Sequence, residues 1–372
     1  MESPGIVVGV PRERAAGETR VALTPDAIER LKKTRVSVLV ERSAGADAGF
    51  PDEQYTAAGA EIAADAVSLH ERASVIARVA PPDAGEAALL RSGTLVLGLL
   101  APFGRDDLAP LLAARGVTAL ALERMPRITR AQSMDVLSSQ ATVAGYRAVL
   151  LASERLPRFF PLLMTAAGTV RPAKVLVLGA GVAGLQAIAT ARRLGAVVSS
   201  FDVRAAAREQ VESLGATFLA IELPEGDGEG AGGYAKELSE EAHRLEQELV
   251  ATHAADSDVV ITTALIPGRP APILVTSAMV AAMNHGSVVV DLAADAGGNC
   301  EATTPGETTV VDGVTIIAPF QPATGMPQHA SQLYARNVAT LLAHLVPEDT
   351  LALDLADEIV GATCIVHEGN VR

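Results

Sequence analysis

The chain has 372 residues, of which 49% are hydrophobic and 20% charged, enough for a large core and more than one domain. Its 30 Lys and Arg against 44 Asp and Glu give a formal net charge of −14, which disfavours binding to a phosphate backbone. With no Trp, 4 Tyr and 7 Phe, aromatic platforms for stacking bases are also disfavoured. We therefore expect no nucleic-acid partner.

The mean hydropathy of +0.28 raises the question of a membrane-spanning segment. One long uncharged stretch, residues 175–191, contains three glycines and reads better as a buried strand followed by a glycine-rich turn. Residues 1–5 lack the features of a signal peptide. The two cysteines, Cys300 and Cys364, exclude a disulfide scaffold and a multi-cysteine zinc site, and we predict no metal site. We expect a cytoplasmic protein without direct membrane insertion.

In chain order, apolar runs alternate with amphipathic stretches. Buried strands are predicted at residues 6–10, 36–40, 75–79 and 94–100, with a helix that starts at Thr24-Pro25-Asp26 between the first two. Residues 134–164 predict one long connecting helix. Four further strands are predicted at residues 175–178, 197–201, 259–262 and 287–292, and the chain is helical again from about residue 328. This alternation predicts parallel sheets covered by helices.

Residues 179–184 read Gly-Ala-Gly-Val-Ala-Gly, directly after a predicted strand and at the start of a predicted helix. In this dinucleotide-binding pattern Gly179 permits a tight turn, Gly181 lets the backbone approach a pyrophosphate, and Gly184 lets helix and strand pack closely. The next strand ends at Asp202, where a carboxylate accepts hydrogen bonds from the adenosine ribose and repels the 2′-phosphate of NADP. Arg204 could pair with that phosphate, but the position of Asp202 favours NAD.

The predicted fold is α/β, with two Rossmann-like domains joined by long helices and an NAD-binding cleft between them. The first domain comprises residues 1–135 and is completed by the tail 328–372. Residues 136–327 form the linking helix and the central NAD(H)-binding domain. Residues 224–233 combine five glycines with three carboxylates, which predicts a mobile loop that is either a slack connector or a lid.

None of the histidines stands out as the proton-transfer group that an ordinary dehydrogenase needs. His70, His243 and His253 are predicted to be surface residues, and His329, after a proline-rich loop, is the one histidine considered as a site residue. The polar segment 127–135 reads either as an exposed helix start or as a loop that faces a ligand cleft, and spacing alone does not decide between them.

Several ordered segments match one family. They are Pro11-Arg12-Glu13, residues 20–25, residues 127–140, residues 179–184, Asp202-Val203-Arg204, residues 232–235, residues 262–268 and residues 291–299. Over essentially its whole length the chain resembles the soluble NAD(H)-binding components (domain I, alpha subunit) of proton-translocating NAD(P) transhydrogenases. Residues 318–328 depart from the family pattern.

The resemblance implies AB-specific hydride transfer from NADH to NADP⁺ held on a partner component, with protons moved by separate membrane-spanning subunits. It implies that Arg127, Gln132, Asp135 and Ser138 hold the nicotinamide end, with Gln132 reaching toward the partner's nucleotide. The cofactor-binding residues it implies are Arg127, Gln132, Gly179, Ala180, Gly181, Val182, Gly184, Asp202, Val203, Arg204, Gly233, Tyr234, Ala264 and Leu265. Tyr234 matches a loop that closes on bound nucleotide, which favours the lid.

The resemblance also implies a homodimer. Because the sequence ends at residue 372 without a spanning helix, we expect the NADP(H)-binding component and the membrane subunits to be separate polypeptides. The expected location is then cytoplasmic, peripheral to the inner membrane through those subunits.

Alanine dehydrogenases share the fold and several segments, and they are the main alternative. That family pairs a Lys on an early strand with a His on the next, whereas this chain has Arg78 at the first position and no His in residues 98–102. Arg20 and Asp295 remain at positions that both families use. A second alternative is a non-catalytic NAD-binding regulatory protein.

Overall fold

The computed structural model describes residues 5–32, 34, 36–100, 106–221, 240–265, 269–347 and 350–372. The chain forms two compact units. Unit 1 comprises residues Met1–Gln140 and Ala323–Arg372, and unit 2 comprises Ala141–Pro322. The limits expected from the sequence were residues 135 and 328. Among the described helices, none combines the length and apolar character needed to cross a bilayer.

Unit 1 is built on a sheet that has eight strands among the described residues, in the order β17-β16-β6-β5-β4-β1-β2-β3. The strands are β1 (Ile6–Val10), β2 (Val36–Glu41), β3 (Glu61–Ala63), β4 (Val75–Ala77), β5 (Leu95–Gly98), β6 (Thr118–Ala121), β16 (Cys364–His367) and β17 (Asn370–Val371). Strands β1 to β6 pair in parallel, and the C-terminal β16 joins β6 antiparallel. The last strands of the chain therefore complete the sheet begun by its first residues.

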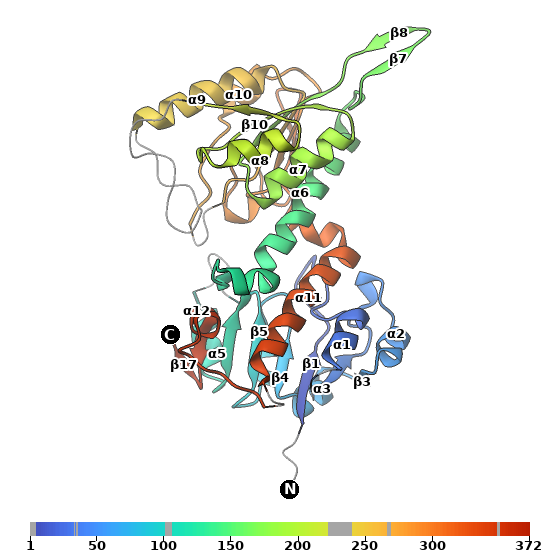
Figure 1. The fold of residues 1–372 in the computed structure, drawn as a ribbon, viewed down its shortest axis with the longest axis vertical. Helices are drawn as coiled ribbons and strands as arrows, with labels where there is room; N and C mark the ends of the chain where they lie inside the picture. The colour runs from blue at the N-terminus through green and yellow to red at the C-terminus, as the bar shows by residue number, and fades with distance from the viewer. Residues whose placement is uncertain are drawn as a thin grey trace. The chain divides into compact units, whose positions relative to one another are not determined.

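The helices of unit 1 cover both faces of this sheet (Figure 1). They are α1 (Pro25–Leu31), α2 (Asp52–Ala57), α3 (Ala66–Arg72), α4 (Ala84–Leu89), α5 (Leu108–Ala113), α11 (Pro327–Leu345) and α12 (Glu358–Thr363), with 3₁₀ turns η1 (Ala46–Ala48), η2 (Leu122–Arg124) and η3 (Thr129–Met134). Successive strand side chains point to opposite faces: Leu95 and Leu97 pack into the core that α11 covers, and Val96 into the core beneath α3 to α5.

Unit 2 contains a second sheet, with seven described strands in the order β11-β10-β9-β12-β13-β15-β14. They are β9 (Lys174–Leu178), β10 (Val197–Phe201), β11 (Thr217–Leu219), β12 (Val259–Thr262), β13 (Val288–Asp291), β14 (Thr308–Val311) and β15 (Val314–Ile317). The strand order reverses at β9, which has β10 on one side and β12 on the other. The predicted α/β class with Rossmann-like parallel sheets is confirmed.

The remaining helices are α6 (Val136–Arg155), α7 (Val182–Arg193), α8 (Ala207–Ser213), α9 (Glu240–Ala255) and α10 (Ser277–Ala282), with 3₁₀ turns η5 (Ala294–Ala296) and η6 (Pro322–Gly325). The predicted helix over residues 134–164 was wrong in its last nine residues. Helix α6 ends at Arg155, and an antiparallel hairpin of β7 (Leu163–Thr165) and β8 (Gly168–Val170) follows (Figure 1). Pro157 and Pro161 explain the break, because proline cannot donate to a helical ladder.

The β14–β15 hairpin was also missed from the sequence, although it had a local signal. Asp312-Gly313 connects the strands, and both residues have positive φ, +50° and +77°. An Asp-Gly pair between two β-branched runs is typical of a two-residue hairpin turn. Val310 on the edge strand β14 is 69% exposed.

Candidate functional site

The glycine turn of unit 2 lies between β9 and α7. Gly179 has φ +96°, in the region that favours glycine, and its N–H donates to the carbonyl of Phe201 at 2.8 Å. A Cβ on Gly184 would lie 1.9 Å from the carbonyl oxygen of Gly179, so helix and turn approach too closely for any side chain. A Cβ on Gly181 would meet nothing within 4 Å. Gly184 is thus required for packing, whereas Gly181 leaves open space beside the backbone.

Helix α7 starts directly behind this open space. Gly181 is its N-cap residue, and Val182, its first residue, is 42% exposed. The first N–H groups of a helix have no partners within the helix, and the helix dipole places partial positive charge there. Pyrophosphate groups bind at helix starts of this kind.

Asp202 follows β10 and is bonded on both carboxylate oxygens. Oδ1 accepts from the backbone N–H and Nε of Arg204, both at 2.9 Å, and Oδ2 accepts from Arg204 Nη2 at 2.8 Å and from the N–H of Ala180 at 2.7 Å. Burial raises the pKa of Asp202, but these hydrogen bonds outweigh it and hold the pKa below its ordinary value. The carboxylate is therefore charged, and Arg204 is folded back on it. Val203, between them, is half-buried.

The loop after β12 joins the glycine turn to β13. Thr263 Oγ1 donates to the carbonyl of Gly179 at 3.1 Å. Asn299 holds the next residue from both sides, because its Oδ1 accepts from the N–H of Ala264 at 3.0 Å and its Nδ2 donates to the carbonyl of Ala264 at 2.9 Å. Leu265 is 46% exposed beside them.

Asp291 supports this loop from the end of β13 and was not identified from the sequence as a site residue. It is fully buried, and its oxygens accept from Thr262 Oγ1 at 3.0 Å and from Thr303 Oγ1 at 2.6 Å. They also accept backbone N–H groups, including that of Asn299 at 2.7 Å. A polar residue that ends an all-apolar strand was the available signal.

The four residues predicted for the nicotinamide end lie in unit 1: Arg127 precedes η3, Gln132 is on it, Asp135 follows it, and Ser138 is in the first turn of α6. Arg127 and Gln132 are exposed, and Asp135 and Ser138 are half-buried. Asp135 accepts from Ser138 at the backbone N–H, at 3.0 Å, and at Oγ, at 2.5 Å. This pair fixes the turn that leads from η3 into α6, and it brings two of the four residues into direct contact.

Buried charges line the carboxyl ends of β1 and β4 in unit 1. Arg78 is 2% exposed, and its Nη2 lies 3.1 Å from Glu86 and 3.5 Å from Glu13. Arg20 is paired with Glu18 at 2.6 Å. Burial raises the pKa of Glu13 to about 7, against the opposing effect of Arg78. The guanidinium groups of Arg78 and Arg20 are thus both paired with carboxylates of the same chain.

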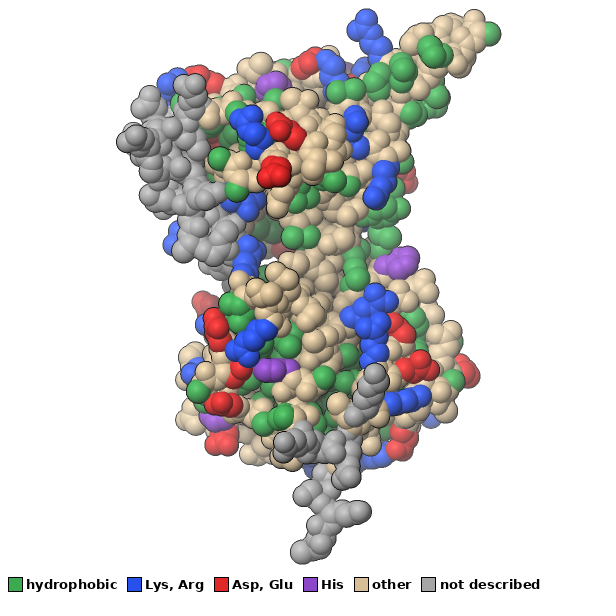
Figure 2. All heavy atoms as spheres, viewed as in Figure 1, with side chains coloured by type: hydrophobic (Ala, Val, Ile, Leu, Met, Phe, Trp, Pro, Cys, Tyr) green, Lys and Arg blue, Asp and Glu red, His purple; other side chains and the backbone are tan. Residues whose placement is uncertain are grey.

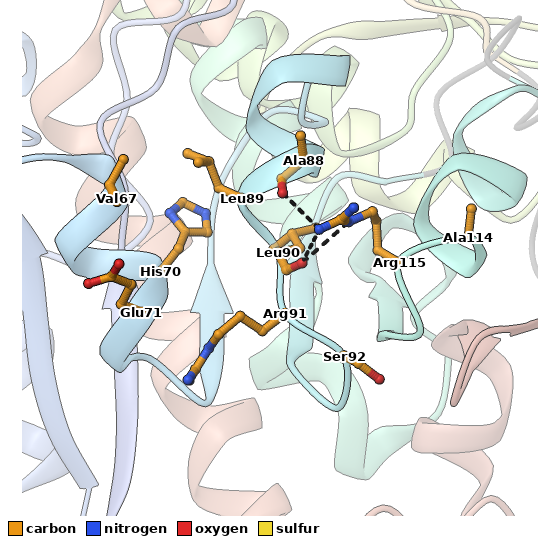
Figure 3. A pocket seen from close by; sticks show the side chains of 10 residues that line it. All are labelled: Val67, His70, Glu71, Ala88, Leu89, Leu90, Arg91, Ser92, Ala114 and Arg115. Carbon is orange, nitrogen blue, oxygen red and sulfur yellow. Dashed lines mark hydrogen bonds between the residues drawn. The ribbon is translucent and has the colours of Figure 1, made fainter.

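A cavity of about 590 Å³ lies elsewhere in unit 1, where α3, α4 and α5 end (Figure 3). This is the edge of the sheet opposite the carboxyl ends of the strands. Arg115 donates across it to the carbonyls of Ala88 and Leu90, at 2.8 and 3.0 Å. None of the predicted site residues lines the cavity, so the cavity is separate from the glycine turn of unit 2 and from the residues around η3.

His70, which also lines this cavity, corrects a prediction. It was expected at the surface but is only 5% exposed, because α3 packs its Leu69 and His70 face against β1 and β2. Its Nδ1 lies 2.7 Å from the carbonyl of Ala66. Burial lowers the pKa of His70, so the ring is held neutral.

Two predicted cofactor residues, Gly233 and Tyr234, lie outside the described residues, as does the predicted lid at residues 224–233. The other predicted site residues are divided between the two units. Unit 1 carries the set around η3, and unit 2 carries the glycine turn, the Asp202–Arg204 pair and the loop after β12.

The comparisons with known proteins point to one family over nearly the whole chain. The model "Alanine dehydrogenase/PNT, N-terminal domain" matches residues 9–144, and "Alanine dehydrogenase/PNT, C-terminal domain" matches residues 148–372. The chain is 45% identical to an NAD(P) transhydrogenase alpha-subunit polypeptide of Rhodospirillum rubrum, with 98% of this chain and 97% of that protein covered.

A solved structure, that of transhydrogenase from Sinorhizobium meliloti, superposes with a TM-score of 0.90 at 48% identity, covering 98% of this chain and all (100%) of that one. Alanine dehydrogenase of Bacillus subtilis is 33% identical over 80% of this chain and 72% of its own length. The resemblance seen in the sequence is thereby confirmed: the chain belongs to the alanine dehydrogenase/PNT family, and it is 45% identical to a transhydrogenase alpha subunit against 33% to an alanine dehydrogenase.

Proposed function

We propose that this chain is the NAD(H)-binding component of a proton-translocating NAD(P) transhydrogenase, and that it passes hydride from NADH to NADP⁺ on a separate component. The observation that carries the proposal is the glycine turn of unit 2, with open space at Gly181 and a charged Asp202 at the end of the adjoining strand. The names of the transhydrogenase relatives support the same reading.

The residues of the turn fit a dinucleotide. The open space at Gly181 admits a phosphate against the backbone, and the N-terminus of α7 stabilises its charge. Asp202 has the carboxylate that adenosine ribose hydroxyls require. Since Arg204 occupies both carboxylate oxygens, it has to release at least one of them when the ribose binds. Selection against NADP follows, because Asp202 repels a 2′-phosphate.

NADH supplies the transferable hydride when bound, and the protein's role is to orient it. Direct transfer between two nicotinamide rings needs no group that removes a proton from a substrate, and a fixed geometry provides most of the acceleration. We propose that Arg127, Gln132, Asp135 and Ser138 hold the nicotinamide end. The Asp135–Ser138 hydrogen bonds would keep this region of unit 1 rigid.

Alanine dehydrogenase activity is disfavoured by the buried charges of unit 1. A 2-oxo acid requires a cation free to bind its carboxylate and a group able to donate a proton. Arg78 is instead held by Glu13 and Glu86, and Arg20 by Glu18, so a substrate carboxylate would have to displace buried ion pairs.

We further propose a homodimer, located at the cytoplasmic side of the inner membrane through partner subunits. The β7–β8 hairpin supports the dimer, because Leu162 and Met164 are 53% and 79% exposed on a projecting ribbon. Figure 2 shows hydrophobic side chains along this projection. Clustered apolar side chains on a protruding element are typical of an interaction surface.

The test of the function is reconstitution. The purified chain is mixed with an NADP(H)-binding transhydrogenase component, and the reduction of an NADP⁺ analogue is followed with NADH as donor. We expect a rate that requires both proteins. No rate above background refutes the proposal, and oxidation of NADH by the chain alone with pyruvate and ammonia would establish alanine dehydrogenase activity instead.

A further inference from the structure

The loop around η3 is held from outside by two side chains of the C-terminal segment of unit 1. Arg130 Nη1 lies 2.7 Å from Oδ2 of Asp357, which stands 227 residues further along the chain. Asn337, on α11, donates from Nδ2 to the carbonyl of Ser133 at 2.8 Å, across 204 residues. One contact fixes the start of η3 and the other its end.

These contacts matter because the loop itself buries little. Arg127, Arg130 and Gln132 are exposed, and only Ala131 and Met134 of η3 are buried. A 3₁₀ turn of this length has weak internal hydrogen bonding. Besides the core packing of Ala131 and Met134, η3 is therefore held by side chains that reach it from other elements.

Asp357 is well suited to hold the loop, because it is itself fixed in place. Its Oδ1 caps α12 by accepting from the N–H groups of Ile359 at 2.9 Å and Val360 at 3.1 Å, and His344 Nε2 lies 3.3 Å away. Partial burial raises the pKa of Asp357, but the hydrogen bonds from Arg130 and its other donors bring it down to about 2. The carboxylate is charged at any working pH.

We propose that Asp357 and Asn337 are positioning residues for hydride transfer: they hold η3 so that Gln132 and Asp135 keep one orientation. This inference rests on the proposed function. It predicts an effect on the rate of transfer and little effect on NADH affinity, because the glycine turn and Asp202, which bind most of the dinucleotide in that proposal, lie in unit 2.

The test uses substitutions that break the contact and keep the fold. Asp357→Asn retains the oxygen that caps α12, and Asn caps helices as well as Asp, but it removes the charge that Arg130 needs. Arg130→Gln breaks the same contact from the other side. The matched control is Glu61→Gln, which breaks the exposed pair between Glu61 and Arg72, at 2.6 Å, in the same unit.

Three quantities are measured for each variant: hydrogen exchange of residues 127–135 in the free protein, the Kd for NADH, and kcat in the reconstituted complex. An ion pair whose side chains are as exposed as those of Arg130 and Asp357 holds its two elements together by up to about 1 kcal/mol. We therefore expect its loss to lower kcat roughly threefold to fivefold. Exchange should quicken in the loop, Kd should stay within about twofold, and Glu61→Gln should change none of the three. The double variant should be no worse than either single one. Asn337→Ala should give the same pattern.

Unchanged exchange in the loop would overturn the proposal, whatever the activity. Faster exchange with an unchanged kcat would also overturn it, since the contact would then be structural only. Absence of transfer by the wild-type protein would refute the proposed function instead, while the exchange measurement still decides whether Asp357 orders the loop.

Discussion

Two glycines of the same turn should respond in opposite ways to one added methyl group. In Gly184→Ala the new Cβ would lie 1.9 Å from the carbonyl oxygen of Gly179, well inside the 3.0 Å below which real contacts essentially do not occur. Backbone on both sides would have to shift, and overpacking of this kind costs about 1–3 kcal/mol. For a domain of this size that corresponds to a Tm lower by roughly 2–12 °C.

Gly181→Ala meets nothing within 4 Å and has φ −75°, which alanine adopts readily. The gain from a stiffer unfolded chain, about 0.4–1 kcal/mol, is offset by the loss of a good N-cap residue, so the Tm should stay within about 3 °C. The methyl group would, however, stand where a pyrophosphate approaches the backbone. We expect NADH to bind roughly tenfold more weakly, or worse, which is about 1.4 kcal/mol.

The assay pairs thermal unfolding with calorimetric titration of NADH on both variants and the wild type. We expect a separation: Gly184→Ala loses stability, and Gly181→Ala loses affinity at nearly full stability. Wild-type affinity in Gly181→Ala would refute the assignment of this space to the pyrophosphate. An unchanged Tm in Gly184→Ala would show that the close approach of helix and turn is not a packing constraint.

Three further predictions follow from the contacts of single side chains. Asp202→Ala should weaken NADH binding and release Arg204 to pair with a 2′-phosphate, so titrations should show a smaller gap between NADH and NADPH; an unchanged NADH affinity would count against the role of Asp202. Glu13, with its pKa raised from 4.5 to about 7, stabilises the fold fully below pH 4.5, and this contribution is lost as the pH rises through 7. His70, with its lowered pKa, makes stability rise with pH instead, so the overall pH dependence of Tm does not isolate Glu13. The check is therefore the difference in Tm between wild type and Glu13→Gln, which should shift in favour of the variant from pH 5 to pH 8. A difference that stays constant over this range would contradict the prediction. Met164→Glu should dissociate the proposed dimer, as seen by light scattering, without lowering the Tm of the monomer, and a dimer that persists unchanged would exclude the hairpin as its interface.

The elements of the fold that could be predicted were those whose signal is local in the sequence. A strand followed by Gly-Ala-Gly-Val-Ala-Gly and a helix is contiguous, and the structure builds β9, the turn and α7 where the pattern predicts them. The helix start at Pro25 is equally local, although Thr24 makes no side-chain capping bond there. Prolines at 157 and 161 were visible but were outweighed by the apolar residues around them, so the hairpin that follows was missed.

The supporting contacts could not be predicted because they join residues far apart in the sequence. Nothing near Asn299 indicates that its amide pairs with Ala264, 35 residues earlier. The same holds for Asp357 and the loop around η3. His70 was misplaced for a related reason: the face of α3 that turns inward is decided by the sheet on which it packs, and a polar ring on that face reads as exposed in the sequence.

Isotope transfer tests the proposed hydride transfer most directly. The chain, reconstituted with an NADP(H)-binding component, is given NADH deuterated at the 4R position of the nicotinamide, with an NADP⁺ analogue as acceptor in ordinary water. We expect deuterium to appear at C4 of the reduced analogue without loss to solvent, and label at the 4S position to stay behind. Label lost to water, or no label transferred, would contradict direct hydride transfer from a nucleotide held by this chain.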